Sequence, residues 1–294
     1  MSFFQNLKAK FSLKKELHRL LCRPLPKRPM TRIHGSMLTS EKREYCPREA
    51  VLHELTGYDP GMEHLSAAMS YTFNMGRMLE EWLQHILSDI LYGNWHCTVC
   101  GDDRQLCKKP SHCGRTDCVC EWRYRSMRFT SPVTGASCEV DLLIDTGAPK
   151  LKVVESKSID KDEARKLSAP YSEHRLRTNL YMRIIDDAGY GDTIDTKSAL
   201  VFYMAKCFGF KDDEVASYGF KDSQFSPFKE FTVMRNDDQT DLVYSKALAV
   251  HNYRLGVGGI PCGVCDSIND KRAMSCPVKK ECFSGKYPPI AEWR

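Results

Sequence analysis

Long apolar runs and an export signal are both missing from this sequence of 294 residues. No apolar stretch reaches the roughly 18 residues that a membrane-spanning helix needs. The N-terminus has no continuous apolar core followed by a small-residue cleavage site, so it does not have the pattern of a secretory signal. We therefore expect a protein without a membrane span that stays in the reducing, cytoplasmic compartment.

A strong charge imbalance, internal repeats and low-complexity tracts are absent as well. The net charge of +5 is mild, so it permits a polyanionic partner without requiring one. The lack of repeats excludes a solenoid or an array. A hydrophobic content of 42% beside 28% charged residues is typical of an ordinary globular protein.

Cysteine, in contrast, is abundant, with fourteen residues in the chain. In a chain with no export signal, this number favours metal ligation over a disulfide framework. Six of the cysteines lie between Cys97 and Cys120, and four lie between Cys262 and Cys282. The clustering predicts two separate metal sites.

The chain is predicted to have one main domain and a basic N-terminal arm. Residues 1–35 are basic and interrupted by prolines, which predicts a short amphipathic helix followed by an extended arm. A solvated cationic tail is the alternative. Residues 36–294 are predicted to form one domain, with a cysteine-rich insert at 94–121 and a cysteine-rich closing segment at 260–285.

Hydrophobic periodicity predicts an α/β fold. Apolar residues at three- and four-residue steps predict a long buried helix from Ser66 to Tyr92, ended by Gly93. These apolar positions are Met69, Phe73, Leu79, Leu83, Ile86, Leu87 and Ile90. Strands through Asp141 and Glu155 follow, and then helix, strand, strand and helix at 173–188, 198–206, 228–234 and 240–254. The fold class is a mixed central sheet flanked by helices.

Two carboxylates and a lysine mark the candidate catalytic centre. Asp141 and Glu155 are expected at the ends of adjacent strands, where two carboxylates can share a divalent cation. Lys157 follows Glu155 by two residues on a strand and therefore points to the same face. Two hard oxygen ligands and a cation are what a Mg²⁺- or Mn²⁺-dependent phosphodiesterase needs.

This centre belongs to a series of five motifs in a fixed order. They are Tyr45-Cys-Pro-Arg-Glu49, Gly76-Arg-Met-Leu-Glu80, Gly135 through Asp141, Val153-Val-Glu-Ser-Lys157 and Arg177-Thr-Asn-Leu-Tyr181. In this order the sequence resembles the PD-(D/E)XK nuclease superfamily, and within it the RecB-like branch of CRISPR-associated and phage exonucleases. The resemblance covers roughly residues 36–206 and the terminal cysteines, and it implies a restriction-endonuclease-like core.

The resemblance implies further site residues. Glu80 stands where relatives carry a metal-binding His or acid, so it is a third candidate ligand for Mg²⁺ or Mn²⁺. An exposed helix glutamate is the alternative, because Glu81 adjoins it. Tyr181 matches the branch, whereas Arg177 stands where a Gln is usual; we expect both to contact substrate, with His174 as a fallback.

Cys97, Cys100 and Gly101 form one half of a zinc knuckle, because the glycine lets the backbone curl around the metal. We predict that Cys118 and Cys120 complete a structural Zn²⁺ site. The alternatives for the second half are Cys107, His112 and, nearest in merit, Cys113. Asp145 and Asp160, which flank the catalytic motif, are predicted to be solvated turn residues.

The C-terminal cysteines allow two combinations. The resemblance implies a [4Fe–4S] cluster held by Cys46, Cys265, Cys276 and Cys282, which would pin the two ends of the domain together. A Zn²⁺ site formed by Cys262 with the last three is the alternative. We favour the cluster, because the resemblance implies the long-range partner Cys46.

These patterns predict a divalent-metal-dependent deoxyribonuclease. We expect an exonuclease acting on single-stranded DNA or on DNA ends, in recombination, repair or phage DNA processing. The alternative is a non-catalytic, metal-stabilised nucleic-acid-binding module of a recombination complex. A sequence-specific endonuclease would need a base-reading element, and the sequence shows none.

Overall fold

The computed structural model describes residues 13–22, 24–27, 33–206 and 227–289. The predicted basic arm is therefore described only in part, and its helix is α1, Leu13–Leu21. No helix among the described residues is both long and apolar enough to cross a membrane. The same residues contain no disulfide.

The chain divides into two compact units. The first consists of Met1–Pro29, as far as it is described, and Asp59–Met78; the second consists of Met30–Tyr58 and Leu79–Arg294. The domain limits expected from the sequence remain predictions. All of the predicted catalytic and cysteine sites belong to the second unit.

The first unit is held together by backbone pairing. Strands β1, Leu25–Pro26, and β2, Met62–Glu63, are antiparallel. Helix α4, Ala67–Ile86, begins in this unit, where the Ser70 hydroxyl donates to the Leu21 carbonyl oxygen at 2.7 Å.

The predicted long helix is shorter and less buried than its periodicity indicated. Helix α4 ends at Ile86, and Gly93 lies inside strand β3, Tyr92–Cys97. A Cβ at Gly93 would lie 2.6 Å from the Tyr124 ring, so this glycine serves close packing and not helix termination. Among the predicted core positions, Leu83 is buried, but Met69, Phe73, Ile86 and Ile90 are exposed.

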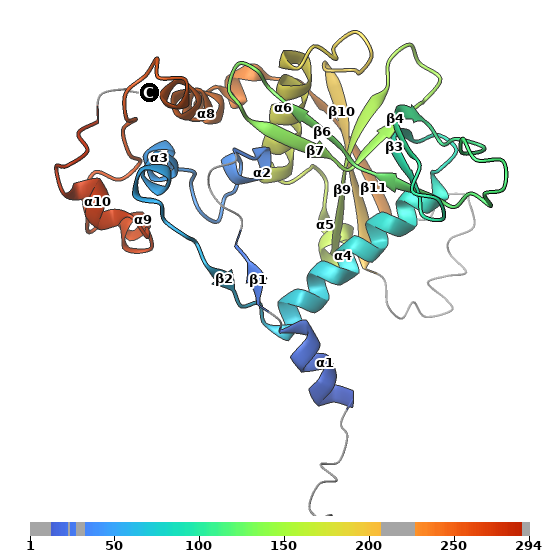
Figure 1. Cartoon of the computed structure of the whole chain (residues 1–294), viewed down its shortest axis with the longest axis horizontal. Coiled ribbons are helices and arrows are strands. Elements are labelled where there is room, and N and C mark those ends of the chain that lie inside the picture. The colour runs from blue at the N-terminus through green and yellow to red at the C-terminus, as the bar shows by residue number, and fades with distance from the viewer. Residues whose placement is uncertain (1–12, 23, 28–32, 207–226, 290–294) are drawn as a thin grey trace, which may run out of the picture. The chain divides into compact units, whose positions relative to one another are not determined.

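A four-stranded mixed sheet forms the centre of the second unit (Figure 1). Its spatial order is β11-β10-β9-β8, with β9 and β10 parallel and the two outer pairs antiparallel. The strands are β8, Leu142–Ile144; β9, Lys152–Asp160; β10, Ser198–Lys206; and β11, Phe228–Met234. The bounds of β10 and β11 are those predicted from the sequence.

Helices cover both faces of this sheet, which confirms the predicted fold class. Helix α6, Ser172–Asp187, packs on one face through Leu180, Ile184 and Ile185, all of them fully buried. On the other face, Leu83 of α4 packs with sheet residues such as Val154 in a second apolar cluster. Strand β9 is buried on both faces, as expected for a central strand.

Two smaller sheets lie beside the central one. Strands β3, β4 (Asp103–Lys108) and β5 (Trp122–Arg125) pair in the order β4-β3-β5. Strands β6, Met127–Thr130, and β7, Ser137–Val140, form a hairpin. The predicted cysteine-rich insert therefore contains β4 and the chain on either side of it.

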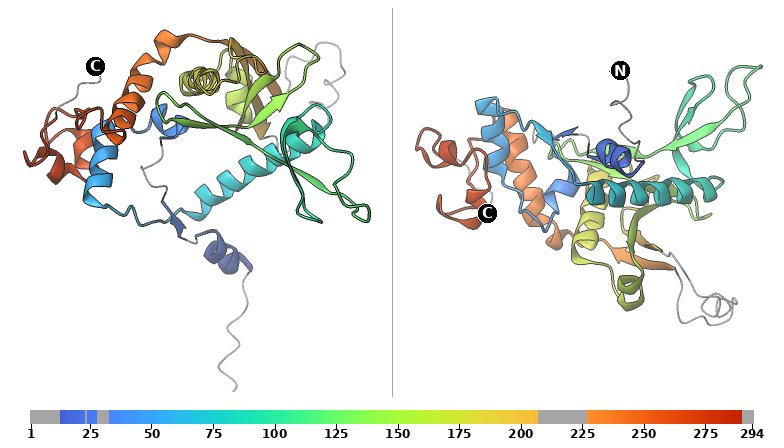
Figure 2. Two further views of the ribbon diagram at one scale, coloured as in Figure 1. Left: turned by 45° about the horizontal axis from the view of Figure 1, so that its top comes forward. Right: turned by 90° about the horizontal axis from the view of Figure 1, so that it is seen from below.

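The second unit contains further helices outside the sheets. Helix α8, Asp241–Arg254, packs against α3, Pro47–Thr56, and α10 also contacts α3 (Figure 2). The remaining short helices are α2, Gly35–Leu38; α5, Lys161–Lys166; α9, Lys271–Met274; and α10, Lys279–Phe283.

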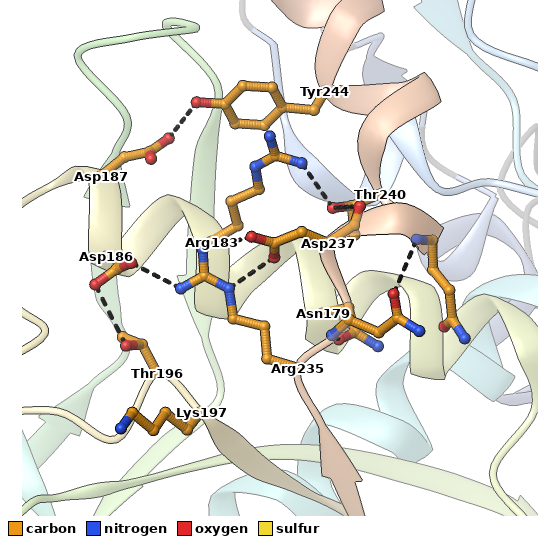
Figure 3. A network of polar contacts seen from close by, with 12 residues as sticks. Asn179, Arg183, Asp186, Asp187, Thr196, Lys197, Arg235, Asp237, Thr240 and Tyr244 are labelled. Carbon is orange, nitrogen blue, oxygen red and sulfur yellow. Dashed lines mark hydrogen bonds and ion pairs between the residues drawn. The ribbon is translucent and has the colours of Figure 1, made fainter.

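A polar network fixes α6 against β11 and α8 (Figure 3). The Arg235 guanidinium contacts Asp186 and Asp237, each at 2.7 Å, which ties α6 to the 3₁₀ turn Asp237–Gln239. Arg183 contacts Asp241 at 2.7 Å and lies 3.6 Å over the ring of Tyr244. These contacts hold the helix that carries Arg177 and Tyr181.

Candidate active site

The two predicted carboxylates lie on neighbouring segments of the sheet. Asp141 occupies the bend between β7 and β8, and the pairing of Leu142 with Val154 places it beside Glu155. The Ser156 amide donates to Asp141 Oδ2 at 2.8 Å. One expectation is corrected: Glu155 lies inside β9 and not at its end, because pairing with β10 continues as far as Asp160.

Lys157 lies between the two carboxylates. Its Nζ is 2.6 Å from Glu155 Oε1 and 3.4 Å from Asp141 Oδ2. It also donates to the Ser156 carbonyl oxygen at 2.9 Å. Alternation along β9 places Lys157 on the same face as Glu155, as predicted.

The pKa values of Asp141 and Lys157 are both shifted by their surroundings. Burial, together with the negative charge of Glu155, raises the pKa of Asp141 to about 7. Burial lowers the pKa of Lys157, but attraction by Asp141 and Glu155 outweighs it, so this pKa lies above its ordinary value. Such shifts are typical of functional sites. The single ammonium does not fully compensate the clustered acids.

Glu80 faces this centre from the last turns of α4. Burial raises its pKa, the positive charge of Lys157 lowers it, and the negative charge of Glu155 raises it again. Its neighbour Glu81 is exposed and forms an ion pair with Arg123 at 2.7 Å. The exposed glutamate of this helix is therefore Glu81, and Glu80 is the one that faces the centre.

Arg177 reaches the centre from α6, whereas Tyr181 packs beneath it. Arg177 Nη1 is 3.6 Å from Glu155 Oε1, and the same guanidinium contacts Glu173. Tyr181 is only 6% exposed, and its ring contacts the backbone of α2 at Gly35. Arg177 is therefore placed to meet a bound anion, and Tyr181 supports the floor of the site.

His174, the fallback residue, lies close to the centre and is engaged with a neighbour. Its Nδ1 is 2.8 Å from the Tyr203 hydroxyl, and Tyr203 pairs with Lys157 across β10 and β9. Burial, with the charges of Lys157 and Arg177, lowers the pKa of His174 to about 4. The imidazole is therefore neutral at physiological pH.

The flanking aspartates lie outside the centre. Asp145 pairs with Lys108 at 2.7 Å, and Asp160 accepts from the Asp162 amide at the start of α5. Asp145 is thus ion-paired as well as partly solvated, whereas Asp160 is an exposed helix cap.

A group of four thiols forms a second candidate site in the insert. The Sγ atoms of Cys97, Cys100, Cys113 and Cys118 all lie within 4.8 Å of one another. The Cys97 and Cys118 sulfurs are 3.8 Å apart, which matches the about 3.8 Å between two ligands held about 2.3 Å from a tetrahedral zinc. The donor set therefore fits Zn²⁺.

The predicted fourth ligand, Cys120, is corrected to Cys113. The Cys120 sulfur instead accepts from the Cys113 amide at 3.0 Å, so it lies beside the group. Gly101 has a φ of +77°, and its amide donates to the Cys97 carbonyl oxygen, as the predicted knuckle requires. Burial raises the pKa of Cys97, but the amides of Cys100 and Val99 bring it down to about 6, which favours a thiolate.

The C-terminal cysteines gather around a small cavity. Its lining contains all four residues of the combination with Cys46, namely Cys46, Cys265, Cys276 and Cys282. Cys262 is not among the lining residues. Within the described chain, the insert is the one place where three or more metal-ligating groups approach within 4.8 Å, so these thiols are more widely spaced than ligands of a single zinc. Wider spacing suits a polynuclear cluster.

Arg48 is a residue of this cavity region that the sequence did not single out. Its Nε donates to Cys282 Sγ at 3.1 Å, and its Nη2 donates to the Cys282 carbonyl oxygen at 3.1 Å. The side chain is buried. The available signal was its position two residues after Cys46, within the motif Tyr45-Cys-Pro-Arg-Glu49.

No protein-family model and no curated protein sequence matches the chain. Among solved structures, the alkaline exonuclease LHK-Exo from Laribacter hongkongensis is 14% identical, with a TM-score of 0.41 over 82% of this chain and 93% of that one. Its complex with dAMP gives a TM-score of 0.40 at the same identity and coverage. The crystal structure of SSO0001 gives a TM-score of 0.35 at 14% identity over 85% and 88% of the two chains. These likenesses are too distant to carry an argument about function.

Proposed function

We propose that this chain is a divalent-metal-dependent deoxyribonuclease. The observation that carries the proposal is the position of Lys157 between Asp141 and Glu155, with the pKa of Asp141 raised to about 7. Adjacent acids with too little positive charge around them favour the binding of a cation.

Asp141 and Glu155, with Glu80 facing them, are the proposed ligands for Mg²⁺ or Mn²⁺. Carboxylate oxygens are the ligands that these hard cations prefer. When bound, the cation supplies Lewis acidity, which lowers the pKa of water and neutralises charge on the scissile phosphate. The Ser156 amide keeps Asp141 Oδ2 fixed for this task.

Lys157 and Arg177 are the proposed electrostatic partners of the reaction. The Lys157 ammonium would orient water and stabilise charge that develops on phosphate oxygens. Arg177, whose guanidinium lies 3.6 Å from Glu155, can bind a phosphate of the strand through two hydrogen bonds.

The order of the five motifs supports the RecB-like branch of the PD-(D/E)XK superfamily. On that basis we propose exonuclease action on single-stranded DNA or on DNA ends, in recombination, repair or phage DNA processing. We also propose a cytoplasmic setting, because cysteines that serve as metal ligands need a reducing compartment.

The cysteines are proposed to hold structural metals. Cys97, Cys100, Cys113 and Cys118 would bind Zn²⁺ and so order the insert. Cys46, Cys265, Cys276 and Cys282 would hold a [4Fe–4S] cluster that joins α3 to the C-terminal segment. Protein purified without oxygen is expected to be brown, and a colourless protein containing zinc at this site would contradict the cluster.

Digestion of end-labelled DNA tests the activity. Single-stranded and duplex DNA labelled at the 5′ or the 3′ end is incubated with the full chain and Mg²⁺ or Mn²⁺. We expect metal-dependent release of short products from one end, which gives the polarity. Site-specific cleavage of a plasmid would instead indicate an endonuclease. Binding of DNA with no cleavage by folded, metal-replete protein would favour the non-catalytic binding module.

A further inference from the structure

A cavity of about 410 Å³ lies between the last turns of α4 and the three-stranded sheet β4-β3-β5. Helix α4 contributes Gln84 and His85 to the lining, and β5 contributes Trp122 and Tyr124. None of these residues has a role in the proposed chemistry or in the metal sites.

The acidic side chains around the cavity are balanced by basic ones, and each of the four has a polar partner. Glu81 pairs with Arg123 at 2.7 Å. Glu121 accepts from the Thr98 hydroxyl at 3.3 Å, and Lys109 Nζ lies 3.4 Å from the Ser88 hydroxyl. Two acids thus face two cations, so the cavity has no surplus positive charge with which to attract a phosphate.

Three aromatic rings, those of Trp95, Trp122 and Tyr124, belong to the remaining lining. The Trp122 side chain is partly exposed but its indole Nε1 is fully buried, so a ligand can meet this ring by its face and not through its N–H. Gln84 and Glu121 add amide and carboxylate groups to the lining. A flat, neutral ring with donors and acceptors along its edge matches this lining, and a nucleobase is such a ring.

Two hydrogen bonds link the lining of the cavity to the candidate active site. Gln84 Nε2 donates to Glu80 Oε1 at 3.2 Å, so a lining residue touches a proposed metal ligand one helical turn away. The hydroxyl of Tyr124, another lining residue, accepts from the Leu143 amide, two residues after Asp141.

We propose that this cavity is a base-binding subsite for the nucleic-acid strand that is cut. This inference rests on the proposed nuclease function. One base, turned out of the stack and next to the scissile phosphate, stacks on the face of the Trp122 ring. Trp122 pairs with Cys97 across β5 and β3, so the thiol site in the insert holds the sheet that carries this ring.

An abasic scan tests the subsite without any change in the cavity. Short single-stranded DNA oligonucleotides, each lacking one base at a successive position, are bound to the full-length Lys157→Ala chain without divalent metal. Loss of base stacking is expected to weaken binding by about tenfold at one position and to have little effect elsewhere. Equal affinity at every position would overturn the proposal.

Tryptophan variants give the second arm of the test. Trp122→Ala is expected to remove the position dependence, and Trp122→Phe to restore it in part, because the smaller ring still stacks. Trp82→Ala is the control: Trp82 lies on α4, the helix on the other side of the cavity, is 46% exposed and does not line the cavity. If Trp122→Ala and Trp82→Ala behave alike, the subsite is not at Trp122.

The two hypotheses fail in different ways. Metal-dependent cleavage that is equally fast on every abasic oligonucleotide, with uniform binding, would leave the nuclease and remove the subsite. A position-specific loss of binding in a wild-type chain that cannot cleave DNA would leave the subsite and remove the nuclease.

Discussion

The two ends of β9 carry the same kinds of side chain in opposite electrostatic states. Lys152 and Asp195 form a pair at 2.7 Å at one end, and Lys157 contacts Asp141 and Glu155 nearer the other. Asp195 is 25% exposed and Asp141 is 21% exposed, so exposure does not separate them.

The difference lies in the balance of donors and acids. Asp195 accepts from the Lys152 ammonium, from the Lys197 and Ser198 amides and from the Ser198 hydroxyl. These bonds outweigh burial and lower its pKa. Asp141 accepts from only one amide and one distant ammonium, so burial and the negative charge of Glu155 prevail and its pKa rises to about 7. The first pair is complete as it stands, whereas the second site lacks positive charge.

The largest expected effect is on DNA cleavage, which should depend on the site around Lys157 and not on the Lys152–Asp195 pair. Asp141→Asn, Glu155→Gln and Lys157→Ala should each lower the cleavage rate by about 10²- to 10³-fold or more, because each removes a ligand or a charge that stabilises the transition state. Lys152→Ala, on the same strand, should cleave at the wild-type rate. A comparable loss in Lys152→Ala would show that the activity depends on the strand as a whole. Rates on labelled DNA give the measurement.

The four thiols of the insert allow a similar comparison between a zinc ligand and a neighbouring cysteine. Cys113→Ser should lose about one zinc per chain and unfold the insert, because thiolates provide all four ligands of such a site. Cys120→Ser, which changes the sulfur beside the group, is the matched control and should keep its zinc. Metal analysis and near-UV circular dichroism report the two outcomes. Zinc loss in Cys120→Ser alone would restore the ligand set expected from the sequence.

Stability against pH should run in opposite directions for the two aspartates. The folded-state pKa of Asp141 is raised from 3.8 to about 7, so its contribution to the stability of metal-free protein falls as the pH rises between these values. The slope is at most about 1.4 kcal/mol per pH unit. Asp141→Asn should flatten this part of the profile.

The pKa of Asp195 is lowered, so its contribution is present above the unfolded-state pKa and is lost as the pH falls below it. Asp195→Asn should therefore lower stability at neutral pH and approach the wild type in acid. Urea titrations at several pH values test both variants. Parallel profiles for the wild type and both variants would contradict the assignment.

The smallest expected effect is the loss of fold stability when the Lys152–Asp195 ion pair is removed. Lys152→Ala should destabilise the fold by about 1–3 kcal/mol, because it leaves Asp195 with one charged donor fewer. Thermal unfolding of this variant beside the exposed control Lys166→Ala measures the difference. A neutral result would mean that solvent replaces the lysine.

The sequence was sufficient wherever a local pattern determines the structure. The β-rich runs at 198–206 and 228–234 became β10 and β11, and the Glu-x-Lys spacing placed Lys157 beside Glu155. Both depend on short-range periodicity, which the chain reports directly.

The errors arose where distant contacts decide. Gly93 looked like a helix end, but its contact with the Tyr124 ring assigns it to a strand. By sequence alone, Cys113 and Cys120 were nearly equal candidates for the fourth ligand. Only the fold of the insert selects Cys113. The cavity at Trp122 was not foreseen, because it forms between α4 and a sheet whose pairing no local pattern reveals.

Titration calorimetry with Mn²⁺ tests the central claim most directly, because it measures cation binding without DNA or turnover. The wild type, Glu155→Gln and Asp195→Asn are compared. Each keeps its cysteine-bound metals, and weakly bound divalent ions are removed before the titration. The account predicts that the wild type and Asp195→Asn bind Mn²⁺ alike and that Glu155→Gln loses the binding. Equal binding by Glu155→Gln and the wild type would contradict it, because the carboxylates of β9 would then not be the cation site.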